Sequence, residues 1–123
     1  MKIHESAENY LETILMLQHK NGHVRSIDIV NELEFSKPSV SIAMKKLRQD
    51  GYITVDGKGY IELSESGRDI ATRIYERHSL LTDLLIALGV CEQTAKEDAC
   101  RIEHDLSAES FQKIKEYVQD KMN

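Results

Sequence analysis

The stretch that decides the fold is residues 36–63, which read SKPSVSIAMKKLRQDGYITVDGKGYIEL. Its first part predicts a helix, because Ser36 is a suitable N-cap, Pro38 falls in the first turn and apolar residues follow at helical spacing. Asp50-Gly51 ends that helix. Two β-rich runs around Asp56-Gly57 then indicate a hairpin, since glycine supplies the positive φ angles of a tight turn. The stretch therefore predicts a helix followed directly by a β-hairpin.

A short helix is predicted before this stretch, from Ser26, and another over residues 6–20 with Ser6 as its N-cap. Two helices joined by a short turn, the second starting with small hydroxyl residues and carrying lysines, are typical of a helix-turn-helix. A helix-turn-helix followed by a hairpin is the winged-helix arrangement. We therefore expect a winged helix in the first half of the chain.

The second half is helical in pattern. A long helix is expected from Ser64 to Gly89, and its apolar stripe is broad enough that part of it should meet another subunit. A further helix is expected over residues 93–105, and Ser107 is expected to cap a last one. The residues expected to point inward on that last helix are Phe111, Ile114, Tyr117 and Val118. The predicted fold class is mainly α with a small β-hairpin, a winged helix-turn-helix followed by an α-helical domain.

Charge and composition narrow the class of protein. The net charge is −5, yet residues 37–48 contain four basic residues and no acidic one. A cationic helix in an anionic chain favours DNA as a partner. The negative charge of the rest of the protein would repel DNA, and a bound divalent cation could locally neutralise part of that charge. No apolar run is long enough to cross a membrane, and early acidic residues exclude a signal peptide. Cys91 and Cys100 lack framework spacing, so we expect free thiols in a cytoplasmic protein.

The chemistry-bearing motif is Cys100-Arg101-Ile102-Glu103-His104. On a helix, its thiol, carboxylate and imidazole would stand at i, i+3 and i+4 and share one face, which can form half of a transition-metal site. The alternative is a surface helix with a core cysteine and two solvated polar residues, and the motif alone favours that alternative. His78 lies within an apolar stripe, where a hydrogen-bonded core histidine is the commoner interpretation.

A winged helix, a long helix with a mid-helix histidine and a later Cys-x-x-Glu-His together resemble the metal-dependent repressors related to the diphtheria toxin repressor and the manganese transport regulator. The matching stretches are residues 8–14, 36–41, 77–78 and 98–104. The resemblance implies a dimeric repressor that binds palindromic operator DNA and controls metal-homeostasis genes. It also implies a DNA-binding domain over residues 1–64 and a dimerisation and metal-binding domain over residues 65–123. We expect the shorter, manganese-type architecture, without the C-terminal SH3-like domain of the iron-type repressors.

The family's metal ligands, carried over by this resemblance, fall on Asn9, Glu12, His78, Cys100, Glu103 and His104. Taken alone, Asn9 and Glu12 would be two solvated polar residues three positions apart. At the position of Asn9, iron-type members have methionine and manganese-type members have aspartate, so this chain follows neither. Cys100 is the iron-type residue, whereas Glu12 follows the manganese type. Thr82 and Lys96 stand where the iron-type ancillary site needs a carboxylate and a histidine, so we expect that site to be absent or altered.

Metal choice follows from the softness of these ligands. Carboxylate suits Mn²⁺, whereas thiolate and imidazole shift preference towards Fe²⁺, Co²⁺, Ni²⁺ and Zn²⁺. With Cys100 as a ligand, the expected metal is Fe²⁺, with Mn²⁺ second. Zn²⁺, Co²⁺ or Ni²⁺ should substitute in vitro.

DNA contacts are expected along the helix that follows the turn. The expected contacts there are Ser36, Lys37, Pro38, Ser39, Ser41, Lys45 and Lys46. Arg25 and the hairpin residue Lys58 are expected to contact phosphates. The alternative for each lysine is a solvated surface position.

Two other functions compete with this interpretation. A small metalloenzyme could use the same ligands to activate water, but the sequence supplies no general base beside an open coordination position, so we expect no enzyme. A winged-helix regulator could instead sense oxidation through Cys100. Metal titration of the reduced protein and of its Cys100→Ser variant would separate that regulator from a metal sensor. Cys91 is interpreted as structural.

Overall fold

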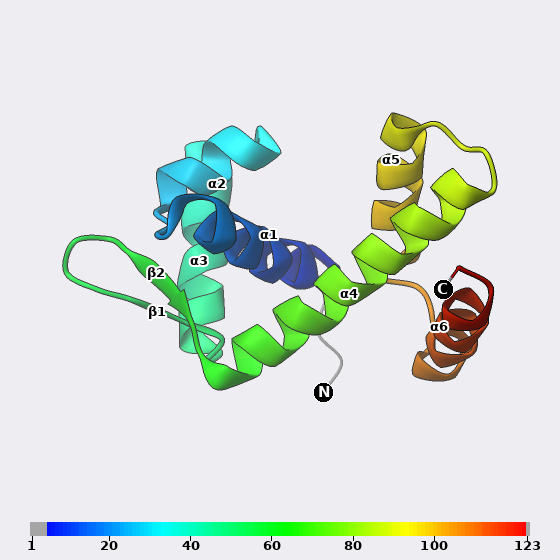
Figure 1. Cartoon of the computed structure of the whole chain (residues 1–123). Coiled ribbons are helices and arrows are strands. Elements are labelled where there is room, and N and C mark those ends of the chain that lie inside the picture. Colours follow the sequence, from blue (N-terminus) through cyan, green and yellow to red (C-terminus); the bar gives the residue numbers. More distant parts are fainter. Residues whose placement is uncertain (1–4, 123) are drawn as a thin grey trace. The chain divides into compact units, whose positions relative to one another are not determined.

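A computed structural model describes residues 5–122 of the chain (Figure 1). The elements are α1 (Glu5–Asn21), α2 (Ser26–Leu33), α3 (Lys37–Gln49), β1 (Ile53–Val55), β2 (Ile61–Leu63), α4 (Glu65–Ala87), α5 (Glu92–Ile102) and α6 (Ala108–Met122). This arrangement confirms the predicted fold class. The chain forms two compact units, Met1–Thr72 and Arg73–Asn123, whose boundary lies within α4. The domain boundary at residue 64 stays a prediction.

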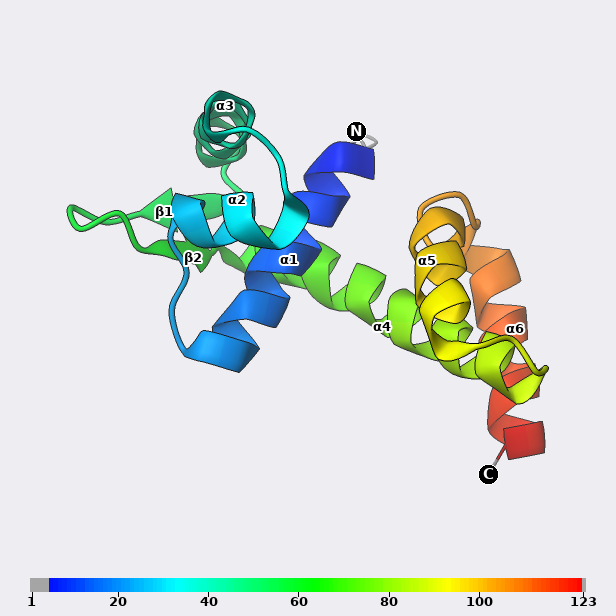
Figure 2. The same cartoon turned by 90° about the horizontal axis from the view of Figure 1, so that it is seen from above.

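The winged helix occupies the first unit. β1 and β2 pair antiparallel, with Val55 opposite Ile61, and the hairpin extends beyond α2 and α3 (Figure 2). The Asp56 carboxylate holds the turn, because its Oδ1 accepts hydrogen bonds from the backbone N–H groups of Lys58 and Tyr60 at 2.8 and 2.9 Å. The backbone N–H of Ile61 donates to the carbonyl of Val24 at 2.8 Å, which ties the segment before α2 to the hairpin.

The core of this unit determines which side of α3 faces water. Val40, Met44 and Leu47 of α3 are buried together with apolar residues of α1, α2 and the hairpin. Ser36 caps α3 as predicted, since its Oγ accepts the backbone N–H of Ser39 at 3.2 Å. The opposite side of α3 is therefore left exposed, and its starting point is fixed by the cap.

The start of α4 is fastened to the segment between α3 and β1. The Ser64 hydroxyl donates to the carbonyl of Gly51 at 2.7 Å and accepts the backbone N–H of Gly67 at 3.2 Å. The Ser64 N–H donates to the carbonyl of Tyr52 at 2.9 Å. Gly67 packs so closely that a Cβ atom built on it would lie 2.0 Å from the Tyr52 carbonyl oxygen. This junction requires glycine for space, and its φ angle is ordinary.

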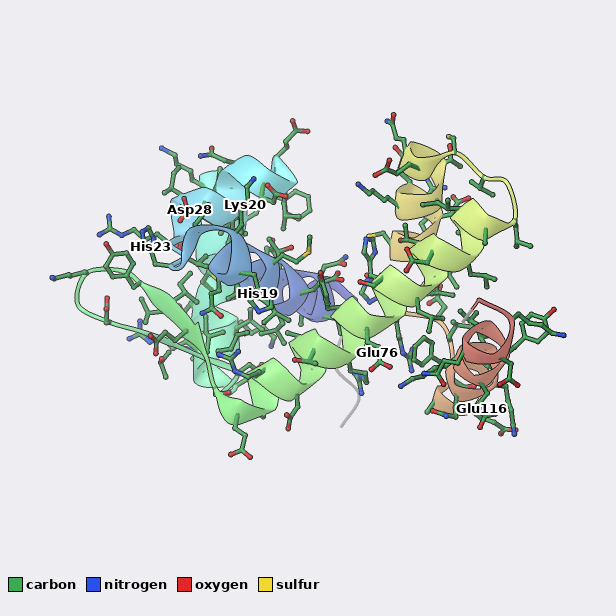
Figure 3. The ribbon with its side chains drawn as sticks, viewed as in Figure 1. His19, Lys20, His23, Asp28, Glu76 and Glu116 are labelled. Atoms are coloured by element: carbon green, nitrogen blue, oxygen red, sulfur yellow. The ribbon has the colours of Figure 1, made fainter. Side chains whose placement is uncertain are left out.

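The second unit contains the rest of α4 with α5 and α6. Ser107 caps α6 as predicted, with its Oγ accepting the N–H of Ser110 at 3.0 Å. Phe111 and Val118 are buried, but Tyr117 is 60% exposed, so its predicted inward position is wrong. At about 100° per residue, Tyr117 lies roughly 120° around the helix from Phe111, off the buried face. An ion pair between Glu76 of α4 and Lys115 of α6 joins these two helices. Figure 3 labels Glu76 on α4 and Glu116 on α6.

Two helix ends also differ from prediction. α1 begins at Glu5, so Ser6 lies inside the helix and does not cap it. α5 ends at Ile102, three residues earlier than expected. No helix in the described part of the chain is both long and apolar enough to span a membrane.

Candidate metal centre and nucleic-acid interface

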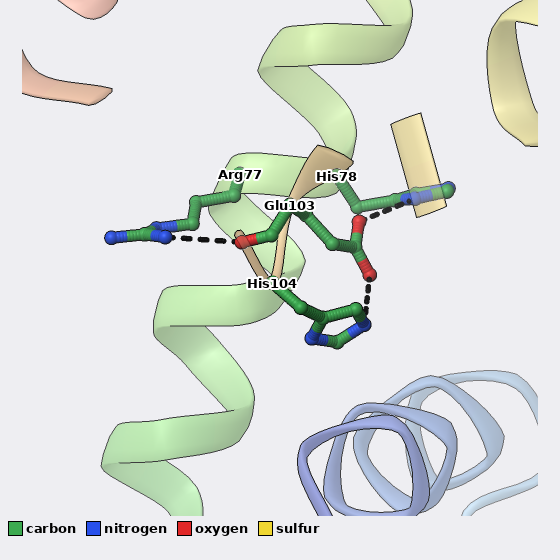
Figure 4. A network of polar contacts seen from close by, with 4 residues as sticks. All are labelled: Arg77, His78, Glu103 and His104. Atoms are coloured by element: carbon green, nitrogen blue, oxygen red, sulfur yellow. Dashed lines mark hydrogen bonds and ion pairs between the residues drawn. The ribbon is translucent and has the colours of Figure 1, made fainter. Parts of the chain in front are cut away.

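The centre of the candidate metal site is the carboxylate of Glu103, which is fully buried in the second unit. Its Oε2 lies 2.9 Å from Nδ1 of His78, on α4, and its Oε1 lies 3.3 Å from Nε2 of His104 (Figure 4). The His104 side chain is almost completely buried, whereas the His78 side chain retains a fifth of its exposure. One carboxylate thus stands between two imidazoles from segments far apart in sequence.

Cys100 completes the cluster predicted from the sequence motif. Donor atoms of Cys100, Glu103 and His104 all lie within 4.8 Å of one another. The expectation that the three residues share one continuous helix is wrong, because α5 ends at Ile102. Glu103 nevertheless keeps helical angles (φ −58°, ψ −26°), and its N–H still donates to the carbonyl of Ala99 at 2.9 Å. The helical spacing of the motif therefore survives through the turn.

Arg77 holds the segment that follows the end of α5. One terminal nitrogen of its guanidinium donates to the carbonyls of Glu103 at 3.0 Å and Leu106 at 2.7 Å. The guanidinium also lies over the ring of Phe111, 5.1 Å from the centroid. A buried cation thus supplies hydrogen bonds to two backbone oxygens of the turn that follows the helix. Sequence reasoning missed this function, although a cation beside His78 in an apolar stripe was an available signal.

The residues present fit a bound cation. Glu103 Oε1 is buried and accepts no hydrogen bond from the described part of the chain. A buried carboxylate is costly unless its charge is compensated. A thiol sulfur, carboxylate oxygens and imidazole nitrogens together suit a divalent transition metal better than Ca²⁺ or Mg²⁺. The donor set and the buried oxygen that accepts no hydrogen bond both favour a metal here.

The other predicted ligands lie on α1, in the first unit. Glu12 is buried and Asn9 is half-buried. Thr82 is buried on α4, and Lys96 forms an ion pair with Glu92 at 3.0 Å. The altered ancillary site stays a prediction.

Cys91 stands apart from the cluster as the N-cap residue of α5 and is exposed. Thr94, whose hydroxyl lies 3.1 Å from the sulfur, lowers the pKa of the Cys91 thiol below its usual value.

The outward side of α3 carries the predicted DNA contacts. Lys37, Pro38, Ser39, Ser41, Lys45 and Lys46 are all exposed there, as is the capping residue Ser36. Arg25 lies over the ring of Tyr60, 4.4 Å from its centroid, and Lys58 is exposed in the hairpin turn. A hollow of about 390 Å³ between α2, α3 and β1 adds Arg48 and Gln49 to this surface, neither of which the motif-based prediction included.

Fold and site together define a winged-helix regulator with a metal-binding helical domain. Residues 2–61 match the family model described as the N-terminal DNA-binding domain of iron-dependent repressors. Residues 64–121 match the model of the metal-binding and dimerisation domain of the same repressors. The chain belongs to this family of metal-dependent transcriptional repressors, which confirms the resemblance inferred from its motifs.

Individual relatives agree with this assignment. The chain is 35% identical over 114 residues to the HTH-type transcriptional regulator MntR of Bacillus subtilis, covering 93% of this chain and 80% of the relative. It is 32% identical over 117 residues to an uncharacterized HTH-type transcriptional regulator of Methanocaldococcus jannaschii, covering 94% of each. These relatives are transcriptional regulators, and they give no support to the alternative of an oxidation sensor.

Solved structures match the fold. A manganese-dependent transcriptional repressor in complex with manganese has a TM-score of 0.84 at 25% identity, with 92% of this chain and 52% of that chain covered. IdeR of T. acidophilum has a TM-score of 0.80 at 25% identity, with 97% and 55% covered. The chain spans about half the length of these solved chains.

Proposed function

We propose that this chain is a metal-dependent repressor that binds a palindromic operator as a homodimer and controls metal-homeostasis genes. The proposed metal is Fe²⁺, with Mn²⁺ second. The proposed ligands are Asn9, Glu12, His78, Cys100, Glu103 and His104. The observation that carries the proposal is the buried Glu103 carboxylate, which lies between two imidazoles and beside the Cys100 thiol.

The preference for Fe²⁺ rests on Cys100. A thiolate favours Fe²⁺ over Mn²⁺, which binds best to carboxylates and water. Several of the relatives are named for manganese, so Mn²⁺ remains the second candidate. A bound divalent cation would supply positive charge to the Glu103 carboxylate, and the four ligands of the second unit would orient it.

Glu12 and Asn9 are proposed as ligands from the family resemblance alone. They belong to the compact unit that contains α3, whereas the other four ligands belong to the second unit. We propose that metal binding favours the dimer geometry that fits DNA. Recognition helices that read a palindrome must lie about 34 Å apart, or a multiple of that distance. Moving the equilibrium between two dimer geometries from 1:99 to 99:1 requires the metal to bind the favoured geometry more tightly by about 5.5 kcal/mol.

The proposed DNA surface is the outward side of α3 together with two phosphate contacts. The side chains proposed to reach the major groove are Ser36, Lys37, Pro38, Ser39, Ser41, Lys45 and Lys46. Arg25 and Lys58 are proposed to contact phosphates. The support is that these positions are exposed and that no acidic residue interrupts residues 37–48. Removing one phosphate contact should reduce the salt slope of binding by about one unit.

Anaerobic titration of DNA binding, metal by metal, tests the proposal. Fe²⁺ or Mn²⁺ should tighten binding to an inverted-repeat operator by at least about tenfold. Glu103→Gln should remove that response, because it replaces the carboxylate by a neutral carboxamide of nearly the same shape. Glu97→Gln is the matched control, because Glu97 is an exposed carboxylate on α5. Equal DNA binding with chelator and with metal would refute the switch. A Cys100→Ser variant that lost its preference for Fe²⁺ over Mn²⁺ would support the assigned metal.

A further inference from the structure

The exposed side of α3 has an apolar residue at its centre. Val40, Met44 and Leu47 are at most 4% exposed and mark the buried side of the helix. At about 100° per residue, Ile42 is turned roughly 200° from Val40 and points away from the core. Ile42 is 70% exposed, so the rest of the described chain covers little of its side chain.

The neighbours of Ile42 on the helix surface are polar or cationic. Residues three and four positions away on a helix are surface neighbours, which for Ile42 are Pro38, Ser39, Lys45 and Lys46. All four are exposed. A single exposed isoleucine is ordinary on a protein surface. An isoleucine framed by two lysines on a helix face without acidic residues is placed to meet an anionic partner that also offers an apolar group.

We propose that Ile42 contacts the C5-methyl group of a thymine in the operator and so selects a T·A pair at one position of each half-site. This inference rests on the proposed function, since it requires α3 to enter the major groove. Thymine methyl is the apolar group that base pairs present there, and the groove is wide enough for a helix. Lys45 and Lys46 add positive charge on either side of Ile42, which favours approach of the helix to anionic DNA.

The same contact would reject other bases. A G·C pair presents hydrogen-bond donors and acceptors at that position, and an isoleucine would remove their water without replacing the bonds. The side chain is also well suited to a fixed contact, because its β-branch restricts χ1. Ile42 is thus a specificity-determining residue, distinct from the hydroxyl and lysine contacts around it.

The experiment starts with the full chain in Mn²⁺ and a library of random duplexes, from which the operator is selected. Each thymine of the operator is then replaced by uracil, which removes only the methyl group. One replacement in each half-site removes two methyl contacts from the dimer complex and should weaken binding roughly fifteenfold, about fourfold for each methyl group. Ile42→Ala should weaken binding to the thymine operator by a similar factor and show no further loss on the uracil operator.

Two controls separate this contact from general weakening. Ile42→Ala should keep the salt slope and the unfolding temperature of the wild type, because the side chain is exposed and uncharged. Lys58→Ala, at a proposed phosphate contact, should instead lower the salt slope by about two units, one for each protomer of the dimer, and keep the roughly fifteenfold difference between thymine and uracil. The two variants therefore change different observables.

The outcomes distinguish this inference from the proposed function. If the metal-loaded protein selects no sequence, the proposed function fails and the inference fails with it. If an operator is selected but no uracil replacement weakens binding, the inference alone is overturned. The same holds if Ile42→Ala retains the full sensitivity to uracil.

Discussion

At the scale of single residues, Arg77 decides whether the metal-binding motif can form. The motif supplies three donors, but Glu103 and His104 lie beyond the end of α5, where no helix holds them. Arg77 fixes that segment through the carbonyls of Glu103 and Leu106. It is a positioning residue, because it acts on the backbone carbonyls of this segment. The geometry of the motif therefore depends on a neighbouring helix.

Replacing Arg77 tests this role. Arg77→Met should weaken metal binding by at least about tenfold and lower the free energy of unfolding by roughly 2–3 kcal/mol, because buried carbonyls lose charge-assisted hydrogen bonds. Arg77→Lys should restore part of both losses, since it keeps the charge with fewer donors. Metal affinity is measured by competition with a chelating dye, and stability by urea unfolding without metal.

Arg101→Met is the control for Arg77, because Arg101 is exposed and forms only a 3.5 Å surface pair with Asp98. Its metal affinity should match the wild type. An Arg77→Met protein that binds metal as tightly as the wild type would contradict the positioning role, whatever its stability.

At the scale of elements, the junction between the winged helix and α4 depends on Gly67. Gly67→Ala would place a methyl group 2.0 Å from the backbone oxygen of Tyr52, and a backbone atom cannot move aside as a flexible side chain can. We expect a loss of about 2–3 kcal/mol in the free energy of unfolding, which is the usual range for overpacking. Thermal or urea unfolding followed by circular dichroism measures the change.

Gly57→Ala is the matched substitution, since a Cβ at Gly57 would meet nothing within 4 Å. Its stability should change by less than about 1 kcal/mol. Equal stability of the two variants would show that the end of α3 and the start of α4 are not packed as described.

At the scale of the whole molecule, the proposed dimer should use apolar residues that remain exposed on the second unit. Ile86 and Leu88, at the end of α4, are 42% and 73% exposed. Leu88→Glu should weaken self-association at least tenfold, because a charge would lose its water in an apolar interface. Sedimentation equilibrium across a range of protein concentrations measures the dimer constant.

Ile42→Glu serves as the control for Leu88→Glu, since it places the same charge on an equally exposed residue of the first unit. It should leave the dimer constant unchanged. If both variants dimerise like the wild type, the end of α4 is not part of the interface.

The sequence by itself determined the winged helix and the part of the metal site formed by Cys100, Glu103 and His104, because both depend on local rules. Caps, turn glycines and helical periodicity act over a few residues, so Ser36, Ser107 and the hairpin turn were predictable. Glu103 follows Cys100 by three residues, and a single helical turn brings them together in the structure.

Only the tertiary structure decided the rest, since packing between distant segments has no local signature. It brought the carbonyls of Glu103 and Leu106 to Arg77, turned Tyr117 out to solvent, and placed the carboxylate of Glu103 against His78, 25 residues away. It also left Ile42 exposed at the centre of α3, because burial of Val40 and Met44 fixes which side faces out. Local sequence determines where the helices form and which metal-ligand residues they carry, whereas packing between distant segments determines where each side chain points.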